Sequence, residues 1–255
     1  MGGAQSLSFS TLNKKSTALD VLEKLSKSNK LASYITVNNS NKDDQPIAIV
    51  TGGSSGIGIP TVRTLALANM KVVLCARNLD AAKEAVRTLP GSVQSNIRIQ
   101  KLDLADMASI EAAAKEITDT EGKMGSGIHV LLNNAGVMAP PKRQATAQNL
   151  ELQFGTNHVG HHMFTRLLLP SMNKDGRIVT VASTAHSFGK LNFQNLNYDA
   201  DAKEERSYSS WGAYGQSKLA NILFAKGLSD ELKQAGSGIK AVSLHPGVIG
   251  TNLWR

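Results

Sequence analysis

The stretch IVTGGSSGIG, Ile49 to Gly58, decides the fold of this chain. It starts within the apolar run Ile47-Ala48-Ile49-Val50, which predicts a strand buried on both faces. It leads into residues 59–69, whose pattern predicts a helix. A glycine-rich turn between a strand and a helix lets backbone N–H groups approach a phosphate closely. The stretch therefore predicts a phosphate-binding turn at the end of a first strand.

Apolar runs and helical patterns alternate from Pro46 onward. The predicted strands cover 47–51, 71–75, 97–102, 128–133, 177–182 and 239–244, and the predicted helices cover 58–69, 79–89, 106–121, 147–172 and 212–235. Alternating units of this kind predict an α/β fold, a doubly wound parallel sheet with helices on both faces. We assign residues 46–255 to this single domain.

Residues 1–45 differ in composition, since they are rich in Ser, Asn and Lys and no acidic residue precedes Asp20. Three interpretations stay open. The start MGGAQS fits N-myristoylation at Gly2, which would bring residues 1–45 to a membrane surface. An acid-poor, Ser-rich leader also fits an organelle transit peptide, and a mobile arm without a targeting role fits equally. Within this segment Leu19, Leu22 and Leu25 have helical spacing and predict a short helix.

The composition of the chain limits its class. Its 255 residues, 41% of them hydrophobic, suffice for one large domain, and no apolar stretch approaches the roughly 18 residues that span a bilayer. Because Cys75 is the only cysteine, we expect an intracellular, reducing compartment, either the cytoplasm or a membrane surface, with a plastid or another organelle as the alternative. The net charge is +8, but the sequence contains no long basic run and no stripe of aromatic residues, so we expect no nucleic-acid partner.

The end of the second predicted strand carries Arg77, in VVLCARN. A site for NAD usually has an acidic residue about 20 residues after the glycine turn, bonded to the ribose 2′-hydroxyl. Arg77 stands 19 residues after Gly58, and no acidic residue occurs between it and Asp80. A guanidinium pairs with a 2′-phosphate, which a carboxylate would repel. The sequence therefore favours NADP(H) over NAD(H); otherwise Arg77 is an ordinary solvated residue.

Two further strand ends carry polar or small residues that suit the same ligand. KLDLAD ends the third strand with Asp103, which can accept a hydrogen bond from an adenine amino group. LLNNAG ends the fourth strand with Asn134-Ala135-Gly136, small enough for the backbone to pass close to a nucleotide. Because the carboxyl ends of parallel strands share one edge of the sheet, these features are expected to meet there.

The segment AYGQSKLAN places Tyr214 and Lys218 four residues apart, on one face of a predicted helix. A phenol has a pKa of about 10, and lowering it to about 7 requires about 4 kcal/mol. One ammonium at about 4 Å, with an effective dielectric constant near 20, supplies about that much. We therefore expect Lys218 to lower the pKa of Tyr214 and to make it a general acid and base.

Three more positions complete this constellation. Ser183 ends the strand RIVTVAS and can bond a substrate oxygen. Asn157, in LQFGTNHVG, lies within a predicted long helix, where a short polar side chain is disfavoured. LHPGVIGTN gives a turn with Pro246, Gly247 and Thr251 that can cover a nicotinamide.

In their order along residues 46–255, TGGSSGIG, NNAG, Asn157, Ser183, Tyr214-x-x-x-Lys218 and HPG resemble the short-chain dehydrogenase/reductase family, a Rossmann fold. The segments ELQFGTNHVGHH and AYGQSKLANILF resemble its retinol-dehydrogenase-like branch, which includes WW-domain oxidoreductases and the chloroplast inner-envelope translocon dehydrogenase. The resemblance implies that Tyr214 is the general acid and base, Lys218 lowers its pKa and binds the nicotinamide ribose, Ser183 polarises the substrate oxygen, and Asn157 holds a water that relays protons.

The resemblance also implies the cofactor contacts and the substrate. The expected contacts are Gly52, Ser54, Ser55, Gly56, Ile57, Gly58, Arg77, Asp103, Leu104, Asn134, Ala135, Gly136, Tyr214, Lys218, Pro246, Gly247 and Thr251. The implied reaction passes a hydride between NADP(H) and the carbonyl or alcohol carbon of a hydrophobic retinoid, steroid or lipid. The alternative is a catalytically weak NADP(H)-binding scaffold or redox-sensing subunit of a membrane-associated complex. A homodimer through the two long helices is a further expectation.

Three remaining expectations concern the C-terminus, the histidines and an aromatic loop. The family continues beyond HPG with another strand and a substrate-covering segment, so we expect the fold to be truncated at its C-terminus. His158, His161 and His162 lack a carboxylate or cysteine to complete a metal site, and we expect no metal. The loop after Ser183 carries aromatic residues that either line the substrate site or fold on one another: Phe188, Phe193, Tyr198 and Trp211.

Overall fold

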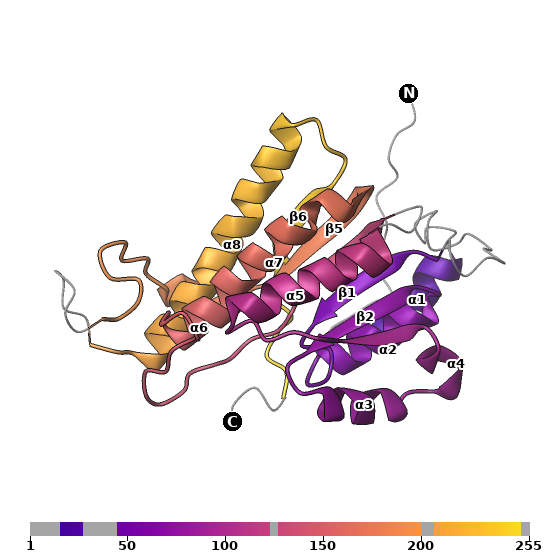
Figure 1. Cartoon of the computed structure of the whole chain (residues 1–255), viewed down its shortest axis with the longest axis horizontal. Coiled ribbons are helices and arrows are strands. Elements are labelled where there is room, and N and C mark those ends of the chain that lie inside the picture. Colours follow the sequence, from indigo (N-terminus) through magenta and orange to yellow (C-terminus); the bar gives the residue numbers. More distant parts are fainter. Residues whose placement is uncertain (1–15, 28–44, 123–126, 200–206, 251–255) are drawn as a thin grey trace.

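The computed structural model describes residues 16–27, 45–122, 127–199 and 207–250. Its centre is a six-stranded sheet in the order β3-β2-β1-β4-β5-β6, with every neighbouring pair parallel (Figure 1). The strands are β1 (Ile47–Thr51), β2 (Lys71–Ala76), β3 (Ile97–Lys101), β4 (Ile128–Asn133), β5 (Met172–Val181) and β6 (Lys240–Leu244). This is the doubly wound α/β fold that the alternating pattern predicts.

Helices cover both faces of the sheet, with α5, α7 and α8 side by side on one of them (Figure 1). The α-helices are α1 (Ala18–Lys27), α2 (Gly58–Leu67), α3 (Leu79–Arg87), α4 (Gly91–Gln94), α5 (Met107–Ile117), α6 (Leu152–Phe154), α7 (Gly160–Leu168) and α8 (Ser210–Gln234). Two π-helical turns, η2 (Thr118–Gly122) and η3 (Gly155–Val159), and two 3₁₀ turns, η4 (Leu169–Ser171) and η5 (Thr184–Phe188), complete the set.

The sheet separates two apolar cores, because successive side chains of a strand point to opposite faces. On one face Ile49 and Val73 pack with residues of α5, α7 and α8, which we call the first core. On the other face Ala48 and Val50 pack with residues of α2 and α3, which we call the second core. All five residues of β1 are buried, as expected for a central strand of a parallel sheet.

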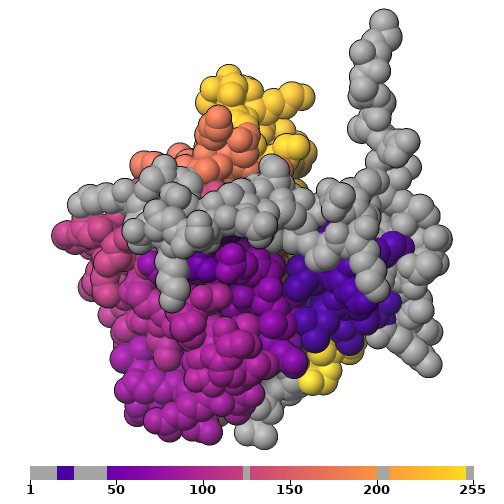
Figure 2. All heavy atoms as spheres, turned by 90° about the vertical axis from the view of Figure 1, so that its right-hand side faces the viewer, coloured from indigo at the N-terminus to yellow at the C-terminus, as the bar shows by residue number. Residues whose placement is uncertain are grey.

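The leucines near the N-terminus form the expected short helix, α1, which packs against α2. Leu22 of this helix contacts the second core. Figure 2 shows α1 in indigo on the surface of the domain. The motif at Gly2 lies outside the described residues. No helix in the described ranges is long and apolar enough to cross a membrane.

The single helix predicted over 147–172 is wrong. A bridge between Ala145 and Glu151 comes first, and the chain then passes through α6, η3, α7 and η4 before β5 begins at Met172. This stretch is closely packed, because a Cβ at Gly155 would collide with Thr146 and one at Gly160 with the Leu104 carbonyl oxygen. Periodicity alone does not reveal such contacts.

Candidate functional site

The glycine-rich turn joins β1 to α2 at the carboxyl edge of the sheet. Gly52 and Gly56 have φ angles of +66° and +52°, a region that glycine adopts readily. A Cβ at Gly58 would collide with the Gly52 carbonyl oxygen, so the backbone of the turn lies in contact with the first residue of α2. No acidic side chain occupies the first turn of α2, which leaves its positive end suited to a phosphate. Ser54, Ser55 and Ile57 belong to this same turn.

The ends of β1 and β4 are joined by hydrogen bonds. The Thr51 hydroxyl accepts from the backbone N–H groups of Asn134, at 2.9 Å, and Ala135, at 3.0 Å. The Asn134 side-chain amide donates to the Thr51 carbonyl at 2.8 Å. A Cβ at Gly52 would lie 2.8 Å from the Ala135 Cα, so the two strand ends are in contact. The predicted NNAG contacts therefore lie beside the glycine-rich turn.

The ends of β2 and β3 carry the residues expected near the adenosine. Arg77 is exposed at the end of β2, and Lys101 Nζ donates to its carbonyl oxygen at 2.5 Å. Two cationic residues therefore lie next to each other at this edge of the sheet. Asp103 is half-buried and accepts from the Ala105 N–H at 3.0 Å through Oδ1. The Leu104 side chain is 7% exposed, so its contact with a cofactor would come from its backbone.

Lys218 places a buried cation at the centre of the site. Its side chain, on α8, is 3% exposed, and Nζ donates to the Val181 carbonyl at 3.0 Å. The same Nζ lies 5.5 Å from the centroid of the Tyr214 ring and 3.7 Å from where a Cβ on Gly136 would stand. No carboxylate in the described part of the chain forms an ion pair with it. Burial lowers the pKa of Lys218 to about 8.

Tyr214 lies beside Lys218 and Ser183, as the sequence predicts, but its pKa differs from the expectation. Its side chain is 5% exposed, and this burial raises the pKa of the phenol. The hydrogen bond from Ser183 acts in the opposite direction and is the weaker influence. The pKa expected from the sequence included the attraction of a phenolate to Lys218 but not the free-energy cost of burying that phenolate. In the free chain the phenol is therefore the stable form.

Asn157 lies in the π-helical turn η3 and is fully buried. Its Oδ1 accepts from the Val137 N–H at 2.8 Å, and its Nδ2 donates to the Val137 carbonyl at 2.9 Å and to Ser217 Oγ at 3.0 Å. Both hydrogens of the amide are used in this way. The backbone carbonyl of Asn157 bonds His161 Nδ1 at 2.9 Å.

The sequence did not lead us to expect a hydrogen bond between two polar residues of this region. Thr51 and His161 form a buried pair, with 2.8 Å between Thr51 Oγ1 and His161 Nε2. Thr51 could have been singled out from the sequence, because it places a hydroxyl at the end of an otherwise apolar strand. His161 was considered only as a metal ligand, although i, i+4 spacing to Asn157 already indicated a shared helix face.

The three neighbouring histidines do not face one another around a common point. His158 bonds Asn221 Oδ1 at 3.3 Å, and burial lowers its pKa to about 4. His162 is exposed and lies edge-on to Phe224. In the described residues no three side chains from His, Cys, Asp and Glu are grouped as metal ligands.

The aromatic residues after Ser183 were expected either to line the substrate site or to pack on one another, and they differ in their exposure. Tyr198 is buried and meets the Tyr208 ring edge-on at 5.6 Å. Trp211 is 43% exposed and meets the Tyr214 ring at 6.1 Å. Phe188 and Phe193 are 52% and 77% exposed. One member is therefore internal packing, whereas the other three present apolar surface on the same loop and helix start.

The turn after β6 is described only in part. Pro246 and Gly247 are exposed beyond the carboxyl end of β6, at the same edge as the other strand ends, and Gly247 has a φ of +94°. Thr251 lies outside the described residues.

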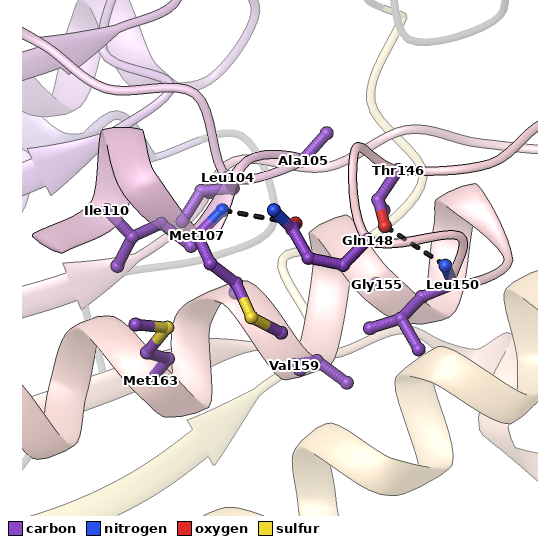
Figure 3. Close-up of a pocket in the computed structure, with 11 residues that line it drawn as sticks. Leu104, Ala105, Met107, Ile110, Thr146, Gln148, Leu150, Gly155, Val159 and Met163 are labelled. Atoms are coloured by element: carbon purple, nitrogen blue, oxygen red, sulfur yellow. Dashed lines mark hydrogen bonds between the residues drawn. The ribbon is translucent and has the colours of Figure 1, made fainter.

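A small pocket lies away from Tyr214, between α5, η3, α7 and the turn that precedes α6 (Figure 3). Gln148 accepts from the Met107 N–H at 3.2 Å across its mouth, and Thr146 Oγ1 accepts from the Leu150 N–H at 3.1 Å. The remaining lining residues are mostly apolar: Leu104, Ala105, Ile110, Gly155, Val159, Gly160 and Met163. None of its lining side chains is titratable.

Comparison with known proteins gives a consistent assignment. Residues 46–200 match the family model for short chain dehydrogenases. The chain is 41% identical over 212 residues to mouse (Mus musculus) retinol dehydrogenase 11, covering 82% of this chain and 63% of that protein. It is 39% identical to the chloroplastic short-chain dehydrogenase TIC 32 B of Brassica napus, covering 82% and 65%. A solved structure from Mycobacterium paratuberculosis, titled a putative uncharacterized protein, has 40% identity and a TM-score of 0.69, covering 80% and 68%. The chain thus spans less than two thirds of the two curated relatives.

Proposed function

The chain belongs to the short-chain dehydrogenase/reductase family, in its retinol-dehydrogenase-like branch, and on that premise we propose an NADP(H)-dependent oxidoreductase. The substrate is the carbonyl or alcohol form of a hydrophobic molecule such as a retinoid, a steroid or a lipid aldehyde or ketone. Bound NADP(H) would supply or accept the hydride at its nicotinamide ring. One observation carries the proposal: the buried Lys218 ammonium, without a carboxylate partner in the described residues, lies against the Tyr214 ring.

The residues at the sheet edge fit this cofactor. The glycine-rich turn leaves no room for a Cβ at Gly58, and the positive end of α2 carries no acidic side chain. Such a turn suits a pyrophosphate. Arg77 and Lys101 together suit a 2′-phosphate. Lys218 lies close to Gly136, which supports a role in binding the nicotinamide ribose.

In the reducing direction, the Tyr214 hydroxyl would give its proton to the substrate oxygen while the Ser183 hydroxyl donates a hydrogen bond to that oxygen. The phenolate left on Tyr214 is then attracted by Lys218. Lys218 Nζ lies 5.5 Å from the centroid of the Tyr214 ring, so this attraction acts against the burial that raises the pKa of Tyr214 in the free chain. The proton lost from Tyr214 would return through Lys218 and a water held by Asn157.

A hydrophobic substrate is supported by two observations. Trp211 lies beside Tyr214 with 43% of its surface exposed, and Phe188 on the neighbouring turn η5 is 52% exposed. Apolar surface next to a reacting group is suited to a substrate without charge. The relative with 41% identity is a retinol dehydrogenase, which makes retinoids the first substrates to test.

The first experiment is a titration of the chain with NADPH and NADH, followed by nicotinamide fluorescence. For an exposed guanidinium near a doubly charged phosphate, Coulomb energies in water predict a loss of about 2 kcal/mol, or about 30-fold, for NADPH in Arg77→Ala. NADH affinity should stay unchanged, and Arg87→Ala, an exposed arginine on α3, is the matched control. Equal affinity of the wild-type chain for both nucleotides would contradict the NADP(H) assignment.

The second experiment is a screen of carbonyl substrates with the wild-type chain and Tyr214→Phe. Loss of a general acid costs about 10²- to 10⁴-fold in turnover. NADPH affinity should be retained, which separates a catalytic from a binding defect. Turnover that is unaffected by Tyr214→Phe would refute the mechanism, and NADPH binding without any turnover would favour the scaffold function instead.

A further inference from the structure

The Thr51 hydroxyl, at the end of β1, has a fully determined set of hydrogen bonds. A hydroxyl offers one hydrogen and two acceptor lone pairs. Both lone pairs are used by the N–H groups of Asn134 and Ala135. Its hydrogen therefore points to His161 Nε2 at 2.8 Å, a much better distance than the 3.4 Å to the Leu132 carbonyl. Nε2 of His161 must then be an acceptor without a proton.

This requirement fixes the tautomer of His161. A neutral imidazole with an unprotonated Nε2 carries its hydrogen on Nδ1, and Nδ1 lies 2.9 Å from the Asn157 carbonyl oxygen. The side chain is 1% exposed, and burial lowers its pKa to about 3, with the charges of Lys218 and His158 acting in the same direction. A protonated ring would also direct a second N–H at a hydroxyl whose lone pairs are both taken. His161 is therefore neutral near pH 7.

We propose that His161 is a positioning residue, whose neutral Nδ1–H form orients the Asn157 carbonyl and couples it, through Thr51, to the strand ends beside the cofactor. This inference rests on the proposed function. The Asn157 side chain is engaged by Val137 and Ser217, so we assign the relay water to its backbone carbonyl. The bond from His161 Nδ1 fixes the position of that carbonyl.

The geometry links two parts of the site that are distant in sequence. Asn134 and Ala135 follow β4, Thr51 ends β1, and His161 belongs to α7. A shift of the loop after β4 would move the Thr51 hydroxyl and, through His161, the carbonyl of Asn157. His161 touches neither the substrate nor the cofactor positions proposed above, so it acts only by placing other groups.

The test uses three single variants of the full chain, one double variant that combines Thr51→Val with His161→Phe, and one matched control. His161→Phe keeps a ring but removes both hydrogen bonds, His161→Gln keeps one donor and one acceptor, and Thr51→Val removes the hydroxyl. His162→Gln, at the exposed neighbouring position on α7, is the control. The readouts are thermal unfolding, the pH profiles of kcat and of kcat/KM, and ¹⁵N NMR of the histidine rings in the free chain.

We expect the NMR spectrum to show His161 protonated on Nδ1 alone, without titration from pH 5 to pH 8. His161→Phe should lower kcat about tenfold, as for the loss of one buried hydrogen bond, with the KM for the carbonyl substrate unchanged. The pH profile of its kcat should also differ from that of the wild-type chain, because the return of the proton to Tyr214 is slowed. His161→Gln should recover most of kcat, and Thr51→Val combined with His161→Phe should cost no more than either alone.

Two results would overturn the inference while leaving the proposed function intact. The first is a proton on Nε2 of His161. The second is a wild-type chain that turns over substrate while His161→Phe keeps its kcat and its pH profile and loses only thermal stability. Absence of turnover in the wild-type chain with every carbonyl substrate would instead overturn the proposed function and the relay together.

Discussion

Replacing Lys218 by methionine is expected to stabilise the free chain while abolishing its turnover. The pKa of Lys218 is lowered by burial from 10.5 to about 8, which corresponds to a penalty of about 3 kcal/mol for the charged form in the folded state at pH 7. Methionine fills a similar volume without a charge. The hydrogen bond lost to the Val181 carbonyl is worth about 2 kcal/mol because its donor is charged, and Asn221 Nδ2 still bonds that carbonyl at 3.2 Å. The net gain is about 1 kcal/mol.

The sign of the pH dependence follows from the two pKa values. Below pH 8 both the folded and the unfolded chain carry the charge, so the penalty of burial is complete. Between pH 8 and pH 10.5 the folded chain has lost its proton and the unfolded chain has not, so the wild-type chain gains stability relative to the variant. The advantage of Lys218→Met should therefore be largest at pH 7 and should disappear near pH 10.

The assay is urea unfolding of both proteins at pH 7 and pH 10 without nucleotide. Lys226→Met is the matched control, because Lys226 is an exposed lysine of the same helix paired with Asp230 at 2.8 Å. It should change the free energy of unfolding little at either pH. A Lys218→Met chain that is less stable than the wild type at pH 7, or a difference that is equal at both pH values, would refute the reasoning.

Three further predictions use paired positions or a chemical probe. Gly58→Ala should weaken NADPH binding or stability, because its Cβ collides with the turn, whereas Gly227→Ala, with open space around it in α8, should stabilise by about 0.5–1 kcal/mol in urea unfolding. Leu168→Ala in the first core should cost about 2–5 kcal/mol by the same measurement, and Leu167→Ala, 40% exposed, much less. The thiol of Cys75, buried with its pKa raised to about 12, should react with a disulfide reagent at pH 8 only as fast as the chain opens.

The sheet and the glycine-rich turn could be predicted because their signals are local. Continuous apolar runs such as residues 47–51 and 128–133 are typical of strands covered on both faces, and the structure has β1 and β4 over these ranges. The position of Tyr214 and Lys218 on one helix face likewise follows from their spacing. These features need no knowledge of distant contacts.

The features that could not be predicted depend on contacts between distant segments. The π-helical turn around Asn157 lies where the chain packs closely against Thr146 and Leu104, and periodicity does not encode such contacts. The partnership of Thr51 with His161 spans 110 residues. The pKa of Tyr214 depends on how deeply the phenol is buried, and the sequence shows the neighbouring charge but not that depth.

The central place of β1 has a consequence for how the domain opens. This strand pairs with β2 and β4 and contributes Ile49 to the first core and Ala48 and Val50 to the second. Its amide hydrogens can meet solvent only when both halves of the domain separate, so their deuterium exchange reports global unfolding. The amides of β6 belong to a strand with a described partner, β5, on one side only, and should exchange through smaller openings. The glycine-rich turn is therefore carried by the last element to loosen.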